Sequence, residues 1–339
     1  MIASLILFVA CTSGSSPDGK GSDAPTDDTD APGGVDQPTS ALVSPTCTDG
    51  QWREALADPS LSIADLKRSF DDLGAAGFLS AALEVRYPAG AYVFAGGLAT
   101  DRMGDCLTTF TSNRDRASAA GMLEAAGTLV HECGHFFDIS EATGRGSTYV
   151  LTETVRFTCS GGSYADTPAR SLINGDAWAP KRPACPGSGP RGCDDYANIY
   201  LDGDPDDRNF DSGDQGLDTV LEETVQYVNS LATDYAFSDR LGSGRSVSAR
   251  DGILTFLWYL ERYLALMRVE APAVHARVLD DACWRDAILS VWGRAWLYLE
   301  ATDGMTTLGI DDRDLEALVT DPALLAEIDA VRAAEGCPP

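Results

Sequence analysis

The chain has 339 residues and a formal net charge of −27, with 52 acidic residues against 25 basic ones. So acidic a chain is repelled by the phosphates of nucleic acids and by anionic lipid surfaces, which argues against a nucleic-acid-binding protein. The length allows one large domain or two closely packed lobes, and we find no internal repeat.

Residues 1–10 are almost wholly apolar and are followed by Cys11. A short apolar run that ends in small residues is typical of a secretory signal peptide, and this run is too short to span a bilayer. The order Val9-Ala10-Cys11 resembles the lipobox of bacterial lipoproteins, although no Lys or Arg precedes the run and Phe8 stands where Leu is usual. The resemblance implies a lipid on Cys11 and a place in the bacterial cell envelope, as an outer-membrane lipoprotein or at the extracellular surface. Plain secretion is the alternative.

Residues 11–46 contain mostly Ser, Gly, Asp, Pro and Thr. Such a composition cannot bury enough apolar surface to offset the entropy lost on ordering the chain. We therefore expect a disordered acidic linker that tethers the folded part to the membrane. Residues 47–339 are expected to form the folded domain.

The first part of this domain is expected to mix helix and strand. Apolar residues at helical spacing predict a helix over 62–73. Two short apolar runs, 82–87 and 91–94, flank the turn-like sequence 88–90 and indicate two strands. With the helices predicted further along the chain, these strands predict the α+β class.

Two of the three histidines lie in the pentapeptide His131-Glu132-Cys133-Gly134-His135. The surrounding run, 113–139, has no proline and repeats apolar residues at helical spacing, so we expect one long buried helix. On a helix, positions i and i+4 share a face, so both imidazoles can bind one metal ion while Glu132 acts as general base. H-E-x-x-H is the zinc-binding signature of the zincin metallopeptidases. The alternatives are a helix with two surface histidines, or a zincin relic that no longer binds metal.

The stretch 144–216 is rich in Gly, Pro, Asp and Cys, with a candidate strand over 149–157. Its acidic run, from Asp202 to Asp214, resembles a calcium-binding loop but lacks the Gly and the Glu of an EF-hand. The sequence leaves two interpretations open here, a Ca²⁺ site and a solvated acidic loop.

Eight cysteines remain when Cys11 is set aside. An even number behind an export signal predicts a disulfide framework. Cys185 and Cys193 are close enough in the sequence for a local bridge, and a bridge from Cys283 to Cys337 would tie the C-terminal tail to a helix. The sequence contains no C-x-x-C pair, which argues against a second zinc site.

The C-terminal part is expected to be helical over 217–231, 248–268, 284–300 and 315–334. A catalytic zinc site needs a third protein ligand besides the two histidines. We predict Glu222, which lies beside the apolar stripe of helix 217–231, with Glu223 as the alternative. Glu141 is a weaker candidate, because the chain lacks the Gly that a metzincin turn needs after the second histidine. The remaining histidine, His275, lies outside any ligand pattern.

Two short segments resemble the anthrax lethal factor-like zincins, which are glutamate zincins. The first matches H-E-x-G-H-x-x-D and ends at Asp138, and the second, 222–226, is similar to their E-[DE]-F-A-E segment. Gln226 stands where that family has an acid. The resemblance implies a zincin-like fold, with a small sheet before the metal helix, a mostly helical C-terminal lobe, and Zn²⁺ held by His131, His135 and Glu222.

The predicted function is that of a lipid-anchored zinc endopeptidase acting on proteins or peptides, with Glu132 as the general base that activates water. Asp138 or Gln226 would orient an imidazole. The chain has no spare histidine to stabilise the oxyanion, so a tyrosine must do so, and the candidates are Tyr149, Tyr196, Tyr200 and Tyr227. Two alternatives stay open, a non-catalytic surface lipoprotein that uses a degenerate zincin scaffold for binding, and a zinc hydrolase of another envelope amide.

Overall fold

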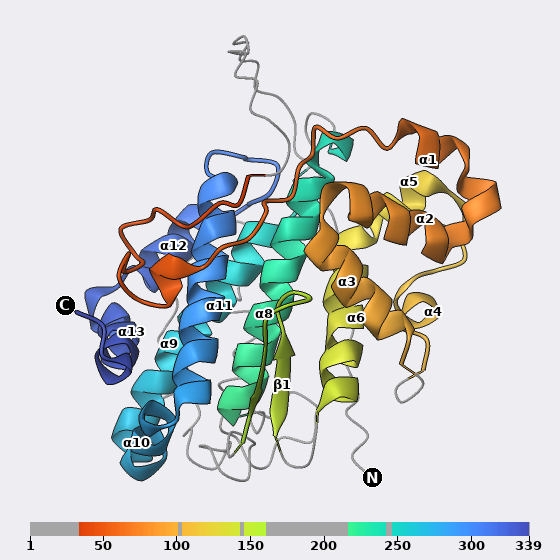
Figure 1. Cartoon of the computed structure of the whole chain (residues 1–339). Coiled ribbons are helices and arrows are strands. Elements are labelled where there is room, and N and C mark those ends of the chain that lie inside the picture. The colour runs from red at the N-terminus through yellow and green to blue at the C-terminus, as the bar shows by residue number, and fades with distance from the viewer. Residues whose placement is uncertain (1–33, 101–103, 143–145, 161–215, 242–245, 339) are drawn as a thin grey trace, which may run out of the picture.

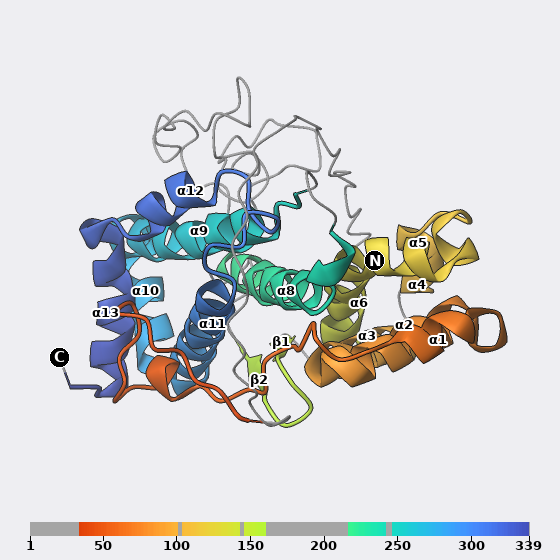
Figure 2. The same cartoon turned by 90° about the horizontal axis from the view of Figure 1, so that it is seen from above.

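The computed structural model describes residues 34–100, 104–142, 146–160, 216–241 and 246–338. These residues are mostly helical, with one antiparallel pair of strands (Figure 1), which confirms the broad α+β class. Three long helices form the centre, namely α8 (Gly216–Ala236), α9 (Ala249–Glu270) and α11 (Ala282–Ala301). Helix α6 (Ala126–Glu141) packs along α8, and α3 (Pro88–Leu98) also packs against α6 (Figures 1 and 2).

The predicted N-terminal strands are wrong, because both runs are helical. Helix α2 spans Phe70–Arg86 and α3 spans Pro88–Leu98. The buried residues of α2 recur at helical spacing instead of alternating, and Pro88 starts α3, where a fixed φ and a missing N–H suit the first turn. A short apolar run alone does not distinguish a strand from a buried helix. The helix expected over 62–73 is present as α1 (Ala64–Arg68) and the start of α2.

The long helix expected over 113–139 is interrupted. It consists of the 3-10 turn η2 (Asp115–Ala117), α5 (Ala119–Glu124) and α6. The side chain of Ser118 caps α5 by accepting the N–H of Gly121 at 3.1 Å. Of these three elements, α6 carries the H-E-x-x-H motif. The short helix α4 (Cys106–Phe110) packs against α6.

The sheet follows α6, the helix with the H-E-x-x-H motif, whereas the sequence predicted a sheet before this helix. Strand β1 (Ser147–Val150) pairs with β2 (Arg156–Cys159), so the candidate strand over 149–157 is a hairpin. Strand β1 packs against both α6 and α8. The N–H of Val150 donates to Oδ1 of Asp138 on α6 at 2.8 Å, so the hairpin is bonded to the last turns of α6.

The helices predicted in the C-terminal part are confirmed, but the structure has one further helix there and divides one predicted helix into two. Helix α10 (Pro272–Asp280) was not predicted. The helix expected over 315–334 is two helices, α12 (Asp312–Val319) and α13 (Pro322–Glu335), because Asp321 caps α13 and Pro322 cannot continue the preceding helix. The remaining short turns are η1 (Asp49–Gln51) and η6 (Ser238–Arg240).

Residues 34–46, which the sequence assigned to the linker, contact the domain. Asp36 pairs with Glu54 in an isolated antiparallel bridge. The carbonyl of Leu42 accepts the indole N–H of Trp292 on α11 at 2.9 Å. The preceding part of the chain, with the expected signal peptide and Cys11, lies outside the described residues.

Three disulfides join described residues, which confirms the disulfide framework. They are Cys47–Cys337, Cys106–Cys133 and Cys159–Cys283. The predicted bridge between Cys283 and Cys337 is wrong, because each has another partner. The predicted pair of Cys185 and Cys193 lies outside the described residues.

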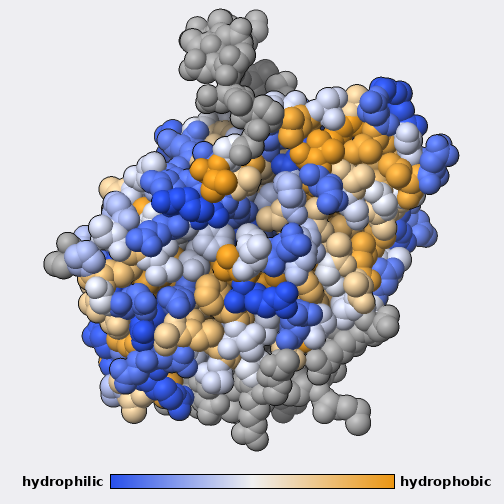
Figure 3. Space-filling model, in the orientation of Figure 1, coloured by the Kyte–Doolittle hydropathy of each residue, from blue (hydrophilic) through white to orange (hydrophobic). Residues whose placement is uncertain are grey.

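Polar and apolar residues are interspersed over much of the face seen in Figure 3. Apolar residues gather at its upper right, over α1 and α2, and Leu73 and Val85 of α2 are 39% and 38% exposed. None of the helices within the described ranges has the length and apolarity needed to span a membrane.

Candidate metal centre

Helices α6 and α8 bring two histidines and one glutamate together. Nε2 of His131 lies 3.5 Å from Oε2 of Glu223, and Nε2 of His135 lies 3.7 Å from the same oxygen. One ligand atom of each side chain lies within 4.8 Å of the other two, so the group could hold a metal ion. Two ligands about 2.1 Å from a tetrahedral ion are about 3.4 Å apart, and the two distances fit that geometry.

The local helical geometry explains how the histidines meet. His131 and His135 are four residues apart, so their rings share one face of α6, with ring centroids separated by 4.7 Å. The side chains of His131 and Glu223 are 12% and 14% exposed, so the group borders solvent. Imidazole and carboxylate are both ordinary ligands of zinc.

Glu222, the predicted third ligand, contacts the other nitrogen of His135. Its Oε1 and Oε2 atoms lie 2.7 and 2.8 Å from Nδ1. Consecutive residues of a helix point about 100° apart, so Glu222 cannot face the Nε2 atoms when Glu223 does. The structure therefore favours Glu223 as the third ligand. A carboxylate on Nδ1 of a histidine fixes the ring and leaves Nε2 free for a metal ion.

The other two ligand candidates lie outside this group. Glu141 ends α6 and pairs with Arg156 of β2 at 2.5 Å. His275 is buried on α10, which packs against α9, α11 and α13. Neither side chain belongs to the group that could hold an ion.

Glu132 lies between the two histidines in the sequence and is half-buried. Its Oε2 atom is covered and accepts no hydrogen bond. Burial raises the pKa of Glu132, its neighbours His131 and His135 lower it, and Glu223 and Glu222 raise it again, so that the net pKa lies above the usual value. A carboxylate with a raised pKa is a better proton acceptor, which suits a general base.

The carboxylates also act on His135. Burial lowers the pKa of His135, but the charges of Glu222, Glu223 and Glu132 and the hydrogen bond from Glu222 outweigh it, so the pKa lies well above its usual value. A metal ion must displace a proton from such an imidazole, so metal binding here should weaken as the pH falls.

A buried chain of polar side chains connects α6 to α8. Nε2 of Gln226 donates to Oδ2 of Asp138 at 2.9 Å, and Nδ2 of Asn229 donates to Oε1 of Gln226 at 2.9 Å. Burial and the charge of Glu222 raise the pKa of Asp138 well above its usual value, although hydrogen bonds from Val150 and Gln226 oppose the shift. Asp138 and Gln226, which the sequence placed beside an imidazole, bond to each other.

Two glycines allow the helices to approach. A Cβ atom at Gly134 would overlap Oε1 of Gln226, and one at Gly97 would overlap the carbonyl oxygen of Cys133. The Gly of the H-E-x-G-H segment therefore has a packing role, because it lets the amide of Gln226 lie directly against α6. The bridge between Cys106 and Cys133 fixes the opposite side of the motif to α4.

Two further residues of α8 lie beside His131, namely Ser230, which the sequence did not single out, and Tyr227, which it named as a candidate oxyanion donor. Oγ of Ser230 lies 3.1 Å from Nδ1 of His131. The ring of Tyr227 meets the His131 ring edge to face, at 4.7 Å between centroids, and stacks on Phe256. Both follow from helical spacing, because Tyr227 and Ser230 lie one and two turns after Glu223 on α8.

The tyrosines predicted as oxyanion donors differ in position. Tyr227 is half-buried beside His131, whereas Tyr149 is fully buried and its hydroxyl donates to the carbonyl of Asp218 at 3.3 Å. Tyr196, Tyr200 and the acidic run from Asp202 to Asp214 lie outside the described residues. Of the described tyrosines that the sequence singled out, Tyr227 is the better placed.

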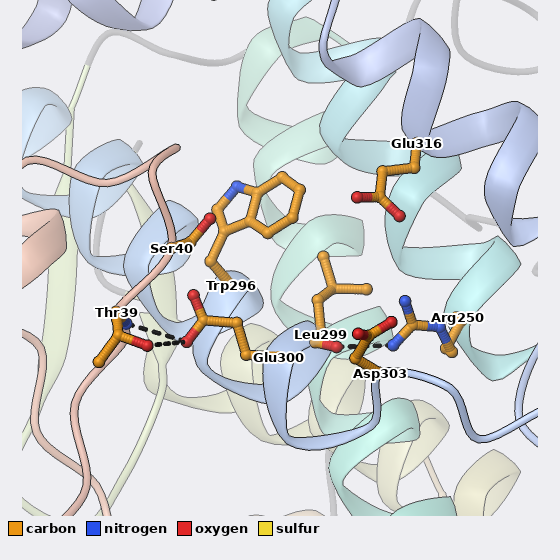
Figure 4. A pocket seen from close by; sticks show the side chains of 8 residues that line it. All are labelled: Thr39, Ser40, Arg250, Trp296, Leu299, Glu300, Asp303 and Glu316. Carbon is orange, nitrogen blue, oxygen red and sulfur yellow. Dashed lines mark hydrogen bonds between the residues drawn. The ribbon is translucent and has the colours of Figure 1, made fainter.

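A cavity of about 330 Å³ lies elsewhere, between α11, α12, the start of α9 and the N-terminal segment (Figure 4). It is lined by Thr39, Ser40, Arg250, Trp296, Leu299, Glu300, Asp303 and Glu316. One oxygen of Glu300 accepts hydrogen bonds from Thr39 in this cavity. No residue of α6 or α8 lines it, so it is separate from the group of His131, His135 and Glu223.

Comparisons of the chain with protein-family models, curated proteins and solved structures found no match.

Proposed function

We propose that the protein is a zinc-dependent endopeptidase of the zincin type, with Zn²⁺ held by His131, His135 and Glu223. The observation that carries the proposal is the convergence of both Nε2 atoms on one carboxylate oxygen, at 3.5 and 3.7 Å. Glu132 lies on the same helix between the two histidines, where H-E-x-x-H enzymes have their general base. The resemblance to the lethal factor-like zincins supports a zinc site on the same two helices, although it implies Glu222 as the third ligand where the geometry favours Glu223.

When bound, zinc would polarise the scissile carbonyl and lower the pKa of the attacking water. Glu132 accepts the proton of that water and passes it to the leaving amine. Glu222 holds the His135 ring through Nδ1, and Ser230 contacts Nδ1 of His131. The hydroxyl of Tyr227 is the donor that we assign to the oxyanion, because its ring packs against His131.

Two measurements test the proposal. The purified full-length chain should contain close to one equivalent of zinc, and it should cleave an unfolded protein substrate. Glu132→Gln should keep the zinc and lose at least about a hundredfold in cleavage rate, the scale of general-base catalysis. A zinc-loaded Glu132→Gln protein that cleaves as fast as the wild type would refute the mechanism. A folded chain that takes up no zinc would favour the binding scaffold.

A further inference from the structure

The direction of the hydrogen bonds in the buried polar chain is set by Arg294 on α11. A guanidinium can only donate hydrogen bonds. Nη1 of Arg294 donates to Oδ1 of Asn229 at 2.8 Å, and the hydroxyl of Tyr87 donates to the same oxygen at 3.3 Å. The amide nitrogen of Asn229 must therefore face the other way, toward Gln226.

This direction is passed on to the metal helix. Because Nδ2 of Asn229 donates to Oε1 of Gln226, the Gln226 amide is also fixed, and its Nε2 atom donates to Asp138. Asp138 follows His135 by three residues on α6, and Gln226 follows Glu223 by three residues on α8. The chain therefore joins the two ligand-bearing helices within one turn of their ligands.

Arg294 is held firmly in its own place. It is 1% exposed, and its Nε atom lies 2.7 Å from Oε2 of Glu54, which is 6% exposed. Its Nη2 atom donates to the hydroxyl oxygen of Tyr87 at 2.6 Å. A reversed Gln226 amide would set its nitrogen against Nδ2 of Asn229, two buried donors without an acceptor between them, which is costly in a low-dielectric interior.

We propose that Arg294 is a positioning residue for the metal centre. Through Asn229 and Gln226 it fixes how α8 sits against Asp138 of α6, and so how far Glu223 lies from the two histidines. The inference rests on the proposed metal-binding function of this site. The positioning role depends on which atom of each amide donates and which accepts. If these side chains only filled space, the direction of their hydrogen bonds would not affect the metal centre.

A pair of substitutions reverses that direction. Asn229→Asp keeps the acceptor for Arg294 but removes the donor to Gln226. Asp138→Asn keeps an acceptor for Val150 but sets an amide nitrogen against Nε2 of Gln226. Combined, the two changes let Gln226 turn over, donate to the new carboxylate at position 229 and accept from the new amide at position 138. The double variant also conserves the number of carboxyl and amide groups in the buried chain.

The readout is zinc affinity of the full-length protein, measured by competition with a chromophoric chelator. We expect each single variant to lose about 10- to 100-fold in zinc affinity and the double variant to return to within about fivefold of wild type. Tyr298→Phe is the matched control, because it removes a hydroxyl that donates to Glu54 at 3.1 Å without altering the bonds to Asp138. It should bind zinc like the wild type.

Losses that simply add in the double variant, or single variants with wild-type affinity, would overturn the positioning role. Circular dichroism of each variant separates weak binding from failure to fold, and a folded double variant tests the proposal even where a single variant does not fold. A wild-type protein that binds no zinc would instead refute the proposed function.

Discussion

Glu222 and His135 form a carboxylate–imidazole pair, with Oε1 2.7 Å from Nδ1. The neighbouring carboxylate, that of Glu223, lies 3.7 Å from Nε2 of the same ring. Two adjacent glutamates thus lie beside the two nitrogens of one histidine, and only Glu223 also lies close to Nε2 of His131, at 3.5 Å, among the contacts of the described residues. In the proposed function, this division gives the first glutamate the orienting role and the second the metal-binding role.

The first prediction separates these two roles. Glu222→Ala should lower zinc affinity by about 10- to 100-fold, the usual cost of removing a residue that orients a metal ligand. Glu223→Ala should lower it further, because a ligand is lost, and Glu141→Ala should leave it unchanged. Chelator competition measures all three variants. If Glu222→Ala were the more damaging change, Glu222 would be the ligand after all.

The second prediction concerns pH and Glu261 on α9. Glu261 is fully buried with neither oxygen hydrogen-bonded, and burial first, then Asp321 and Glu327, raises its pKa to about 10. The folded protein keeps this proton while the unfolded chain loses it above its ordinary pKa, so stability falls as pH rises between these values. The loss is at most about 1.4 kcal/mol per pH unit.

Glu261→Gln should remove this slope. Urea unfolding measures the free energy of unfolding of both proteins at about pH 6 and about pH 8. Between these two pH values, the difference in this free energy between Glu261→Gln and wild type should grow in favour of the variant by up to about 3 kcal/mol. Glu316→Gln on α12, a half-buried position, is the control and should follow the wild type. Parallel pH dependence of Glu261→Gln and wild type would contradict the assignment.

The third prediction concerns Gly134. A methyl group there overlaps Oε1 of Gln226, so Gly134→Ala should destabilise the protein by about 1–3 kcal/mol and weaken zinc binding. Gly77→Ala is the matched control on α2, since its Cβ would meet only Cβ of Leu73 at 3.7 Å, and it should gain up to about 1 kcal/mol from helix propensity. In a Gln226→Ala background the effect of Gly134→Ala should shrink. An equal loss in both backgrounds would mean that the glycine matters for another reason.

The fourth prediction tests the lipid expected on Cys11. If the lipobox-like order Val9-Ala10-Cys11 functions as such, the protein in its native host should enter the detergent phase on phase partitioning. Cys11→Ser should move it to the aqueous phase, because one acyl-bearing residue is then lost. Identical partitioning of the two proteins would exclude lipidation.

The sequence was sufficient for features that depend on local periodicity. H-E-x-x-H places His131 and His135 on one face of a helix wherever that helix lies, since the four-residue step is a property of the helix itself. The amphipathic pattern of α8 likewise predicted a second helix bearing acidic residues. The apolar pattern gave a wrong prediction of strands over 82–87 and 91–94, because short apolar runs fit a strand and a buried helix equally well.

Only the tertiary structure decided what depends on how elements face each other. Glu222 and Glu223 are adjacent in the sequence, and the rotation of α8 against α6 determines which one meets the Nε2 atoms. The partners of Cys283 and Cys337 depend on contacts across the whole chain. The hydrogen bonds from Arg294 through Asn229 to Gln226 likewise join helices far apart in sequence, because a donor specifies its acceptor by distance and direction and leaves no periodic signal in the sequence.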